Sequence, residues 1–258
     1  MTSNQTCEVI YRDESLVAIN KPSGLLVHRS PIDRHETRFA LQMVRNQMGR
    51  HVYPVHRLDK PTSGVLLFGL SSDIAREISA QFAAGTVHKN YLAVVRGHCP
   101  EGGQIDHALK EEWDRIADRD RRADKAAQSA TTRFHRLATV EIPFAVDRYP
   151  QSRYSLVALQ PITGRRHQLR RHMKHLGYPI IGDAKHGKGV HNRFFQAQYH
   201  CHRLLLACTG LELVHPVSGE ALCLRAGLDA PFTGVLQAFD WQGAVPPELL
   251  YSAPVSVQ

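Results

Sequence analysis

The chain lacks the features that would place it in a membrane or in an oxidising compartment. It has no run of about 18 apolar residues, and residues 1–6 have none of the basic and apolar character of a secretory signal. Its five cysteines are odd in number and form no Cys-x-x-Cys pair, which argues against a disulfide framework and a thiolate zinc site. We therefore expect a cytoplasmic protein that is not membrane-bound, with reduced and buried cysteines.

Signatures of bound cofactors are missing as well. The sequence has no glycine-rich dinucleotide fingerprint, no phosphate-binding P-loop and no His-Glu-x-x-His zinc motif. Its sixteen histidines are numerous, and His200-Cys201-His202 has the residue types of a metal site, but no acidic partner lies at ligand spacing. We expect no metal and no cofactor, and we interpret the histidines as partly exposed or core side chains.

What the chain does have is an ordinary globular composition and an excess of positive charge. Its 258 residues, 43% hydrophobic and 22% charged, allow one large domain or two small ones, which would bury roughly 75% of the unfolded surface. The net charge of +8 favours a polyanionic partner, but charge alone does not distinguish RNA from DNA or an acidic membrane. Motifs must therefore identify the partner.

Short strand-like segments recur along the chain and outnumber the helices. They lie at residues 8–10, 16–19, 25–27, 64–69, 88–95, 152–159 and 204–213. Hairpin returns with inserted helices are typical of an α+β fold, with a mixed, mostly antiparallel central sheet and flanking helices.

Two helices are predicted. The first follows Ser71-Ser72 as a core scaffold and ends at Gly85; its apolar positions fall four residues apart, at Ile74, Ile78 and Phe82. The second spans residues 168–176 and ends at Gly177. One apolar stripe of Leu169, Met173 and Leu176 faces the core, which leaves Arg170, Arg171 and Lys174 elsewhere on the helix surface.

The most informative stretch is residues 56–64, HRLDKPTSG, which sets one carboxylate between cations ahead of an apolar strand. If it is extended, Arg57 and Asp59 project to one face while Leu58 anchors the other. A carboxylate held by adjacent cations stays ionised at neutral pH and can attack or take a proton. The alternative is a structural ion pair at a strand end.

The same stretch resembles the catalytic motif of the RluA-type pseudouridine synthases, enzymes that isomerise uridine within RNA. Residues 17–28, 89–97 and 163–170 resemble the family's opening, tyrosine and arginine motifs, in the family's order and spacing, and residues 179–183 follow them. The resemblance runs from about Val9 to Gly227. It implies the pseudouridine synthase fold and a reaction that needs no redox cofactor, metal or nucleotide.

The resemblance also implies roles for individual residues. Asp59 takes the essential step, as the nucleophile or as the base that starts an elimination. Tyr91 supports the base and helps to move a proton. Without the motif, the alternative is that Tyr91 is an ordinary strand tyrosine. Arg170 pairs with the carboxylate and Leu169 gives an apolar wall to the base pocket. Arg57 occupies the space left by a flipped base, and a structural ion pair to Asp59 is its alternative.

A basic run adjoins the arginine motif. Residues 163–175 contain five Arg or Lys and no acid, which is typical of a phosphate footprint. The alternative is a solvated helix face. Arg165 and Arg166 could also contest the role of Arg170, and the RNA-binding set is Arg57, Arg165, Arg166, Arg171 and Lys174.

Peripheral segments favour one substrate within the family. Residues 137–143, 148–150, 153–154, 164–172 and 182–187 most resemble the group that modifies uridine-65 of tRNA, although residues 144–147 match no motif. We therefore expect tRNA as the partner. A ribosomal RNA pseudouridine synthase and a catalytically idle RNA-binding module remain alternatives. A retaining glycosidase is disfavoured because no second carboxylate is suggested near Asp59.

The expected organisation is one catalytic domain over residues 8–245 and a tail over residues 246–258, with no separate N-terminal RNA-binding module. Residues 110–125 contain six positive and six negative side chains. This pattern favours a solvated helical face over an RNA contact, and the segment could be a substrate-selecting insertion. We expect a monomer with no obligatory protein partner.

Overall fold

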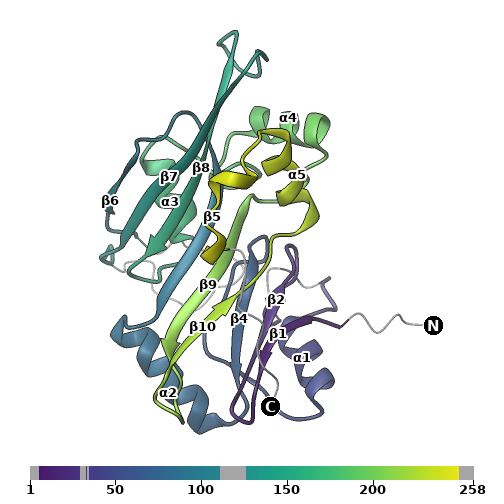
Figure 1. Cartoon of the computed structure of the whole chain (residues 1–258), viewed down its shortest axis with the longest axis vertical. Coiled ribbons are helices and arrows are strands. Elements are labelled where there is room, and N and C mark those ends of the chain that lie inside the picture. Colours follow the sequence, from purple (N-terminus) through teal and green to yellow (C-terminus); the bar gives the residue numbers. More distant parts are fainter. Residues whose placement is uncertain (1–5, 30–32, 34, 111–125, 250–258) are drawn as a thin grey trace, which may run out of the picture.

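The computed structural model describes residues 6–29, 33, 35–110 and 126–249. An elongated ten-stranded sheet runs through the molecule (Figure 1), in the order β1-β2-β4-β9-β5-β8-β7-β6, with β10 beside β9 and β3 beside β4. The strands are β1 (Glu8–Arg12), β2 (Leu16–Lys21), β3 (Tyr53–Pro54), β4 (Ser63–Gly69), β5 (His88–Arg96), β6 (Gly102–Asp106), β7 (Thr131–Ile142), β8 (Ser152–Pro161), β9 (Leu206–Val214) and β10 (Ala221–Arg225).

All strand pairs are antiparallel except β4 with β9, which are parallel. The helices are α1 (Ala40–Met48), α2 (Ser72–Ala84), α3 (Gln168–His175), α4 (Gly189–Tyr199) and α5 (Ala230–Ala238), with 3-10 turns at Gln242–Ala244 and Pro247–Leu249. The predicted α+β fold with a mostly antiparallel sheet is confirmed. In the part of the chain that the structure describes, none of the helices is long and apolar enough to cross a membrane.

Helices cover both faces of the sheet, and its central strands are therefore buried on both sides. In the half built on β2 and β4, alternate residues of each strand join two apolar clusters, one packed with α2 and the other with α1. In the half built on β5 and β8, alternate residues pack under α4 and α5 on one face and under α3 on the other. The face under α4 and α5 is the one seen in Figure 1.

The two predicted helices are confirmed as α2 and α3. Ser71 caps α2 by accepting a hydrogen bond from the Ile74 amide, and Gly85 ends it with a left-handed backbone. α3 ends one residue earlier than predicted, and its stripe of Leu169, Met173 and Leu176 packs in the core as expected.

Three predictions about local structure are wrong. Residues 25–27 form no strand; they contribute only one isolated bridge, from Leu26 to Phe39. Arg170 is not on the helix surface but only 6% exposed, because two carboxylates compensate its charge inside the protein. Four cysteines are buried as expected, but Cys223 is exposed on the outward face of β10. The predicted insertion at 110–125 lies, from 111 onward, outside the described residues.

Candidate active site

The loop that carries Asp59 is anchored by its own flanking residues. His56 accepts a hydrogen bond from the Leu67 amide at 3.0 Å and stacks on Phe82. Burial lowers the pKa of His56 to about 3, with a further contribution from Lys89, so its imidazole is neutral and its Nε2 is free to accept. Leu58 is buried, Arg57 is exposed and Asp59 is half-buried, which matches the predicted alternation. The loop then turns, and the Thr62 amide donates to the Asp59 carbonyl at 3.0 Å.

A glycine sets where the loop ends. Gly64 has φ +111°, and a Cβ there would lie 2.0 Å from the Cys208 carbonyl oxygen of β9. Only a glycine at this position allows β4 to lie so close to β9. The parallel pairing of Ser63 with Ala207 belongs to the same contact. The motif's closing Ser-Gly therefore places Asp59 at the junction of β4 and β9, near the middle of the sheet.

The turn before α3 is held by one glutamine. Gln168 accepts hydrogen bonds from the Thr163 hydroxyl and the Arg165 amide, and it donates to Thr131 and Thr132 of β7. All its polar positions are used in a side chain that is only 4% exposed. The first turn of α3 is thus fixed against the sheet, which fixes the direction of Arg170 two residues later.

Arg170 is shared between two carboxylates. Its Nη1 donates to Asp59 Oδ2 at 3.1 Å, while its Nε and Nη2 form a two-point contact with Asp183 at 2.7 and 2.8 Å. Burial opposes the charge on Arg170, but the carboxylates of Asp183 and Asp59 raise its pKa. The guanidinium fork is therefore set by Asp183 and presents one of its other N–H groups to Asp59.

Asp183 is itself fully committed to orienting this arginine. It is 2% exposed, and its Oδ1 also accepts from the Lys185 and His186 amides at 2.9 and 2.8 Å. Burial would raise its pKa, but the hydrogen bonds and charge of Arg170, together with these amides, lower it. The result is a buried ion pair that stays charged and holds its geometry.

A histidine pair borders the same Asp59 oxygen that Arg170 contacts. His167 Nε2 is 3.8 Å from Asp59 Oδ2, and its Nδ1 is 3.2 Å from His186 Nε2. Burial lowers the pKa of His167 to about 4, against the opposing charge of Asp59. A neutral imidazole therefore borders the carboxylate at neutral pH.

Tyr91 lies on β5 next to this group. It packs between the clusters under α2 and α3, and its backbone pairs with Cys208. Burial raises its pKa well above the usual value, with further contributions from Cys208 and from the charge of Asp59. The tyrosine is a neutral hydroxyl within electrostatic reach of Asp59. Leu169 belongs to the same cluster, where it is 6% exposed, and its role as a wall of the base pocket stays a prediction.

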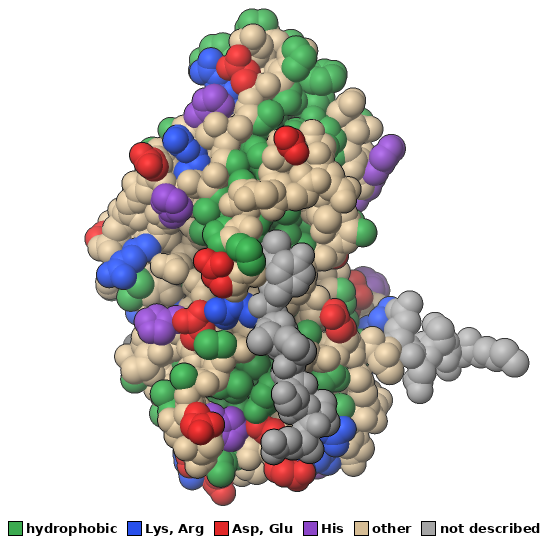
Figure 2. Space-filling model, viewed as in Figure 1, with side chains coloured by type: hydrophobic (Ala, Val, Ile, Leu, Met, Phe, Trp, Pro, Cys, Tyr) green, Lys and Arg blue, Asp and Glu red, His purple; other side chains and the backbone are tan. Residues whose placement is uncertain are grey.

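The remaining predicted residues lie toward solvent. Arg57 is exposed, and its guanidinium makes no ion pair with Asp59, both residues being within the described part of the chain. Arg165 and Lys174 are exposed, whereas Arg166 and Arg171 are half-buried. Arg165 donates to the Ser129 carbonyl. On the opposite face of the sheet, the described cationic side chains that Figure 2 shows lie scattered among acidic ones.

The structure joins Asp59 and Arg170, which sequence reasoning had paired, and brings Tyr91 within electrostatic reach of Asp59; their catalytic roles stay predictions. Sequence reasoning missed Asp183, His167 and His186. These three lie within or next to the quoted motifs, yet their residue types and spacing gave no chemical signal. Only the fold, which turns the chain back after α3, brings them to Asp59. Among the described residues, no group of three or more His, Cys, Asp or Glu side chains is arranged to hold a metal ion.

An α+β sheet with a half-buried carboxylate near its centre, an arginine that contacts this carboxylate and a basic helix beside it form a site suited to an enzyme that acts on a polyanionic substrate such as RNA. Comparison with known proteins places the chain among such enzymes. Residues 15–175 match the family described as RNA pseudouridylate synthase, and the chain belongs to this family.

Relatives of known name are similar in sequence to this protein over nearly the whole chain. A protein of Yersinia pestis named tRNA pseudouridine synthase C is 54% identical over 93% of this chain and 93% of its own length. One of the same name from Vibrio cholerae is 52% identical over 91% of this chain and 96% of its own. The solved structure of human RNA pseudouridylate synthase domain containing 1 superposes with a TM-score of 0.67 at 23% identity, covering 93% of this chain and 97% of that one. The predicted family and fold are confirmed.

Proposed function

We propose that this protein is a tRNA pseudouridine synthase that isomerises one uridine, uridine-65 in the T-stem region, with Asp59 as its catalytic carboxylate. The observation that carries the proposal is the hydrogen bond from Arg170 to Asp59 at the foot of the basic helix α3. Relatives that cover nearly the whole chain and are named for tRNA support the choice of substrate, and the peripheral segments named above support the position. The protein acts as a cytoplasmic monomer.

The reaction exchanges one bond for another. The bond from ribose C1′ to the base nitrogen N1 breaks, the uracil ring rotates, and a bond forms from C1′ to ring carbon C5. C5 then loses its proton and N1 gains one, so no atom and no electron is gained or lost. Such a reaction needs a group that attacks or deprotonates the ribose, support for the detached base, and a proton acceptor.

The site supplies these functions from its own side chains. Asp59 acts on the ribose, either as the nucleophile at C1′ or as the base that starts an elimination; both routes need the ionised form that Arg170 favours. The Tyr91 ring gives the detached uracil an aromatic surface, and its neutral hydroxyl can take part in moving a proton.

The cationic side chains near Asp59 bind the RNA and extrude the target nucleotide. A uridine in a helix is out of reach, so the enzyme must flip it out of the stack at a cost of a few kcal/mol. Arg57, exposed and two residues before Asp59, can fill the space that the base leaves. Arg165, Arg166, Arg171 and Lys174 neutralise phosphates on either side.

The first test is the variant Asp59→Asn on an unmodified tRNA transcript. We expect pseudouridine formation to be lost while the Kd for tRNA stays within a few-fold, because the carboxylate does the chemistry and the cations bind the RNA. The assays are pseudouridine mapping and filter binding. Asp73→Asn is the matched control, since Asp73 is an exposed carboxylate paired with Arg76 on α2.

Other results of these assays would contradict the role of Asp59 or favour a different function. Turnover by Asp59→Asn would contradict the role of Asp59. Modification of ribosomal RNA but not of tRNA would favour the ribosomal synthase, and RNA binding without pseudouridine on either substrate would favour an idle binding module.

A further inference from the structure

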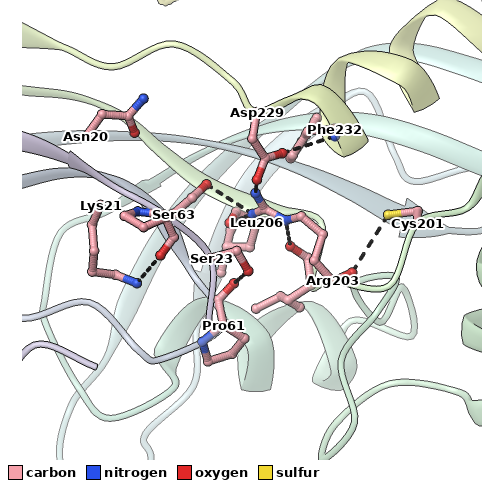
Figure 3. A network of polar contacts seen from close by, with 12 residues as sticks. Asn20, Lys21, Ser23, Pro61, Ser63, Cys201, Arg203, Leu206, Asp229 and Phe232 are labelled. Atoms are coloured by element: carbon pink, nitrogen blue, oxygen red, sulfur yellow. Dashed lines mark hydrogen bonds and ion pairs between the residues drawn. The ribbon is translucent and has the colours of Figure 1, made fainter. Parts of the chain in front are cut away.

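The loop after Asp59 is held on one side by the turn that follows β2. Lys21 is fully buried, and its ammonium donates to the carbonyls of Pro22, Leu25 and Lys60. The Ser23 hydroxyl donates to the Pro61 carbonyl at 2.7 Å. Figure 3 shows this side of the loop. The carbonyls of the two residues after Asp59 are thus fixed from the direction of β2.

Arg203 holds the same loop from the opposite direction. Its Nη2 donates to the Ser63 hydroxyl at 3.0 Å and to the Leu206 carbonyl at 2.9 Å, and its Nε donates to the Leu204 carbonyl. Figure 3 shows the guanidinium lying between Ser63 and Asp229. Ser63 is the first residue of β4 and lies four positions after Asp59, so Arg203 fixes the far end of the catalytic loop.

The charge of Arg203 has a dedicated partner. Its Nη1 forms an ion pair with Asp229, whose other oxygen caps α5 by accepting from the Phe232 amide. The guanidinium also lies over the Phe232 ring, 5.7 Å from its centroid. The side chain of Arg203 is only 8% exposed. It therefore has no access to a phosphate, and we exclude it from the RNA-binding set.

The backbone of Arg203 contacts the second half of the site. A Cβ on Gly182 would lie 1.9 Å from the Arg203 carbonyl oxygen, so the two backbones touch directly beside Asp183. Two residues on, the Leu205 amide donates to the Ile181 carbonyl at 2.9 Å. The segment after Arg203 therefore supports the loop of Asp183, which orients Arg170.

We propose that Arg203 is a positioning residue for the isomerisation: it fixes the Asp59 loop through Ser63 and the Asp183 loop through its backbone, and so sets the distance between Asp59 and Arg170. The inference rests on the proposed function of Asp59. Arg203 touches neither Asp59 nor Arg170, and it acts only by holding their supports. A displacement of about 1 Å in such a site lowers the rate about 100-fold.

The experiment compares Arg203→Gln with Arg225→Gln in the full-length protein. Arg225 is the matched control because its side chain is 11% exposed and paired with Glu212 at 2.6 Å, and its hydrogen-bond partners are Glu212, Leu224 and Glu248 rather than residues of the Asp59 loop. For Arg203→Gln we expect the single-turnover rate of pseudouridine formation on tRNA to fall about 100-fold, with the tRNA Kd within threefold of the wild type. Arg225→Gln should keep its rate within threefold, even where both variants lose a similar amount of Tm.

Two further measurements test the positioning role of Arg203 if Arg203→Gln does not fold, or if tRNA is not the substrate. Ser63→Ala removes one contact of Arg203 and should lower the rate about 10-fold without a large change in Tm. A crystal structure of either variant should show the distance from Arg170 Nη1 to Asp59 Oδ2 above its present 3.1 Å, a readout that needs no RNA.

The outcomes separate the two proposals. Unchanged rates and an unchanged 3.1 Å distance in Arg203→Gln and Ser63→Ala would overturn the positioning role. An equal loss of rate in Arg225→Gln would overturn it too, since the effect would then be one of general stability. A wild-type protein that forms no pseudouridine on tRNA contradicts the proposed function, and the distance measurement still decides the role of Arg203.

Discussion

At the scale of single residues, the site depends on one arginine that serves two carboxylates. Arg170 spends two of its donors on Asp183, which is buried, and one on Asp59, which is open to a substrate. A lysine could not replace it, because an ammonium cannot form the two-point contact with Asp183 while reaching Asp59. Arg170 is therefore both a structural and a functional residue.

Arg170→Ala should lose activity and stability together. The change leaves Asp183 as an uncompensated buried charge, which should lower the free energy of unfolding by about 3–5 kcal/mol, and it removes the partner of Asp59. Lys174→Ala on the exposed side of α3 should leave the unfolding free energy unchanged within about 0.5 kcal/mol. It should weaken tRNA binding and reduce its salt slope by about one. Urea unfolding and salt-dependent filter binding measure the two effects, and equal stability of the two variants would contradict the buried role.

The residues that sequence could identify are those whose chemistry is visible in a motif. Asp59, flanked by cations, and Arg170, in a run without acids, were predicted in their roles as partners. Asp183 could not be, because Gly-Asp after an apolar segment is also an ordinary turn. Arg203 gave no signal either, since its partners Ser63 and Asp229 are 140 and 26 positions away in the chain.

At the scale of elements, the sequence predicted best where the pattern was continuous. The fully apolar run of β4 and the capped helix α2 were found almost to the residue. β7 was not predicted, because one of its buried side chains, Thr132, is polar and a bulge between Arg136 and Ala138 interrupts the strand's pairing register. Which face of β4 meets which helix could not be predicted, because all seven of its residues are buried and no polar face marks the solvent side.

The element that carries Asp59 should make stability depend on pH through His56. Its folded pKa of about 3 lies below the unfolded value near 6.5, so the unfolded chain binds the proton first as the pH falls. The stability that this residue contributes is complete above pH 6.5 and is lost progressively toward pH 3. Between pH 7 and pH 5 the loss should reach about 2 kcal/mol.

The variant His56→Gln isolates this effect, because a glutamine oxygen can still accept from the Leu67 amide but does not titrate. We expect the fall in unfolding free energy from pH 7 to pH 5 to be smaller in His56→Gln than in the wild type. His51→Gln, at an exposed histidine, should keep the wild-type fall. Urea unfolding at the two pH values measures it, and an identical fall in all three proteins would show that His56 is protonated in the folded state.

At the scale of the whole molecule, the site lies where two halves of one sheet meet. Asp59 comes from the half of β2 and β4, and Arg170 and Asp183 come from the half of β5 and β8 under α3. β4 and β9 join these halves through only two paired positions, Ser63 with Ala207 and Gly64 with Cys208. The geometry of the site is therefore a property of the complete sheet, and neither half contains it.

This arrangement sets how RNA must approach. The cations of α3 lie beside the carboxylate on one face, whereas the described cationic side chains seen on the opposite face are scattered among acidic ones (Figure 2). Recognition by this face should be largely by shape and phosphate, which suits a small folded RNA. We expect an unmodified tRNA transcript to gain one pseudouridine in the T-stem region, without added nucleotide, metal or partner protein.

The extrusion step gives the sharpest test of this view, since it depends on the RNA fold as well as on the protein. Arg57→Ala should slow the reaction strongly on folded tRNA but less on an oligonucleotide whose target uridine is already unstacked, because part of the few kcal/mol needed for flipping is then absent. Arg165→Ala removes an exposed cation from the turn before α3. It should lower the reaction rate on both RNAs by a similar factor. The measurement is the ratio of wild-type to variant single-turnover rates on each RNA. A larger ratio on folded tRNA for Arg57→Ala alone supports base replacement by this arginine, whereas equal ratios on the two RNAs would reduce Arg57 to a phosphate contact.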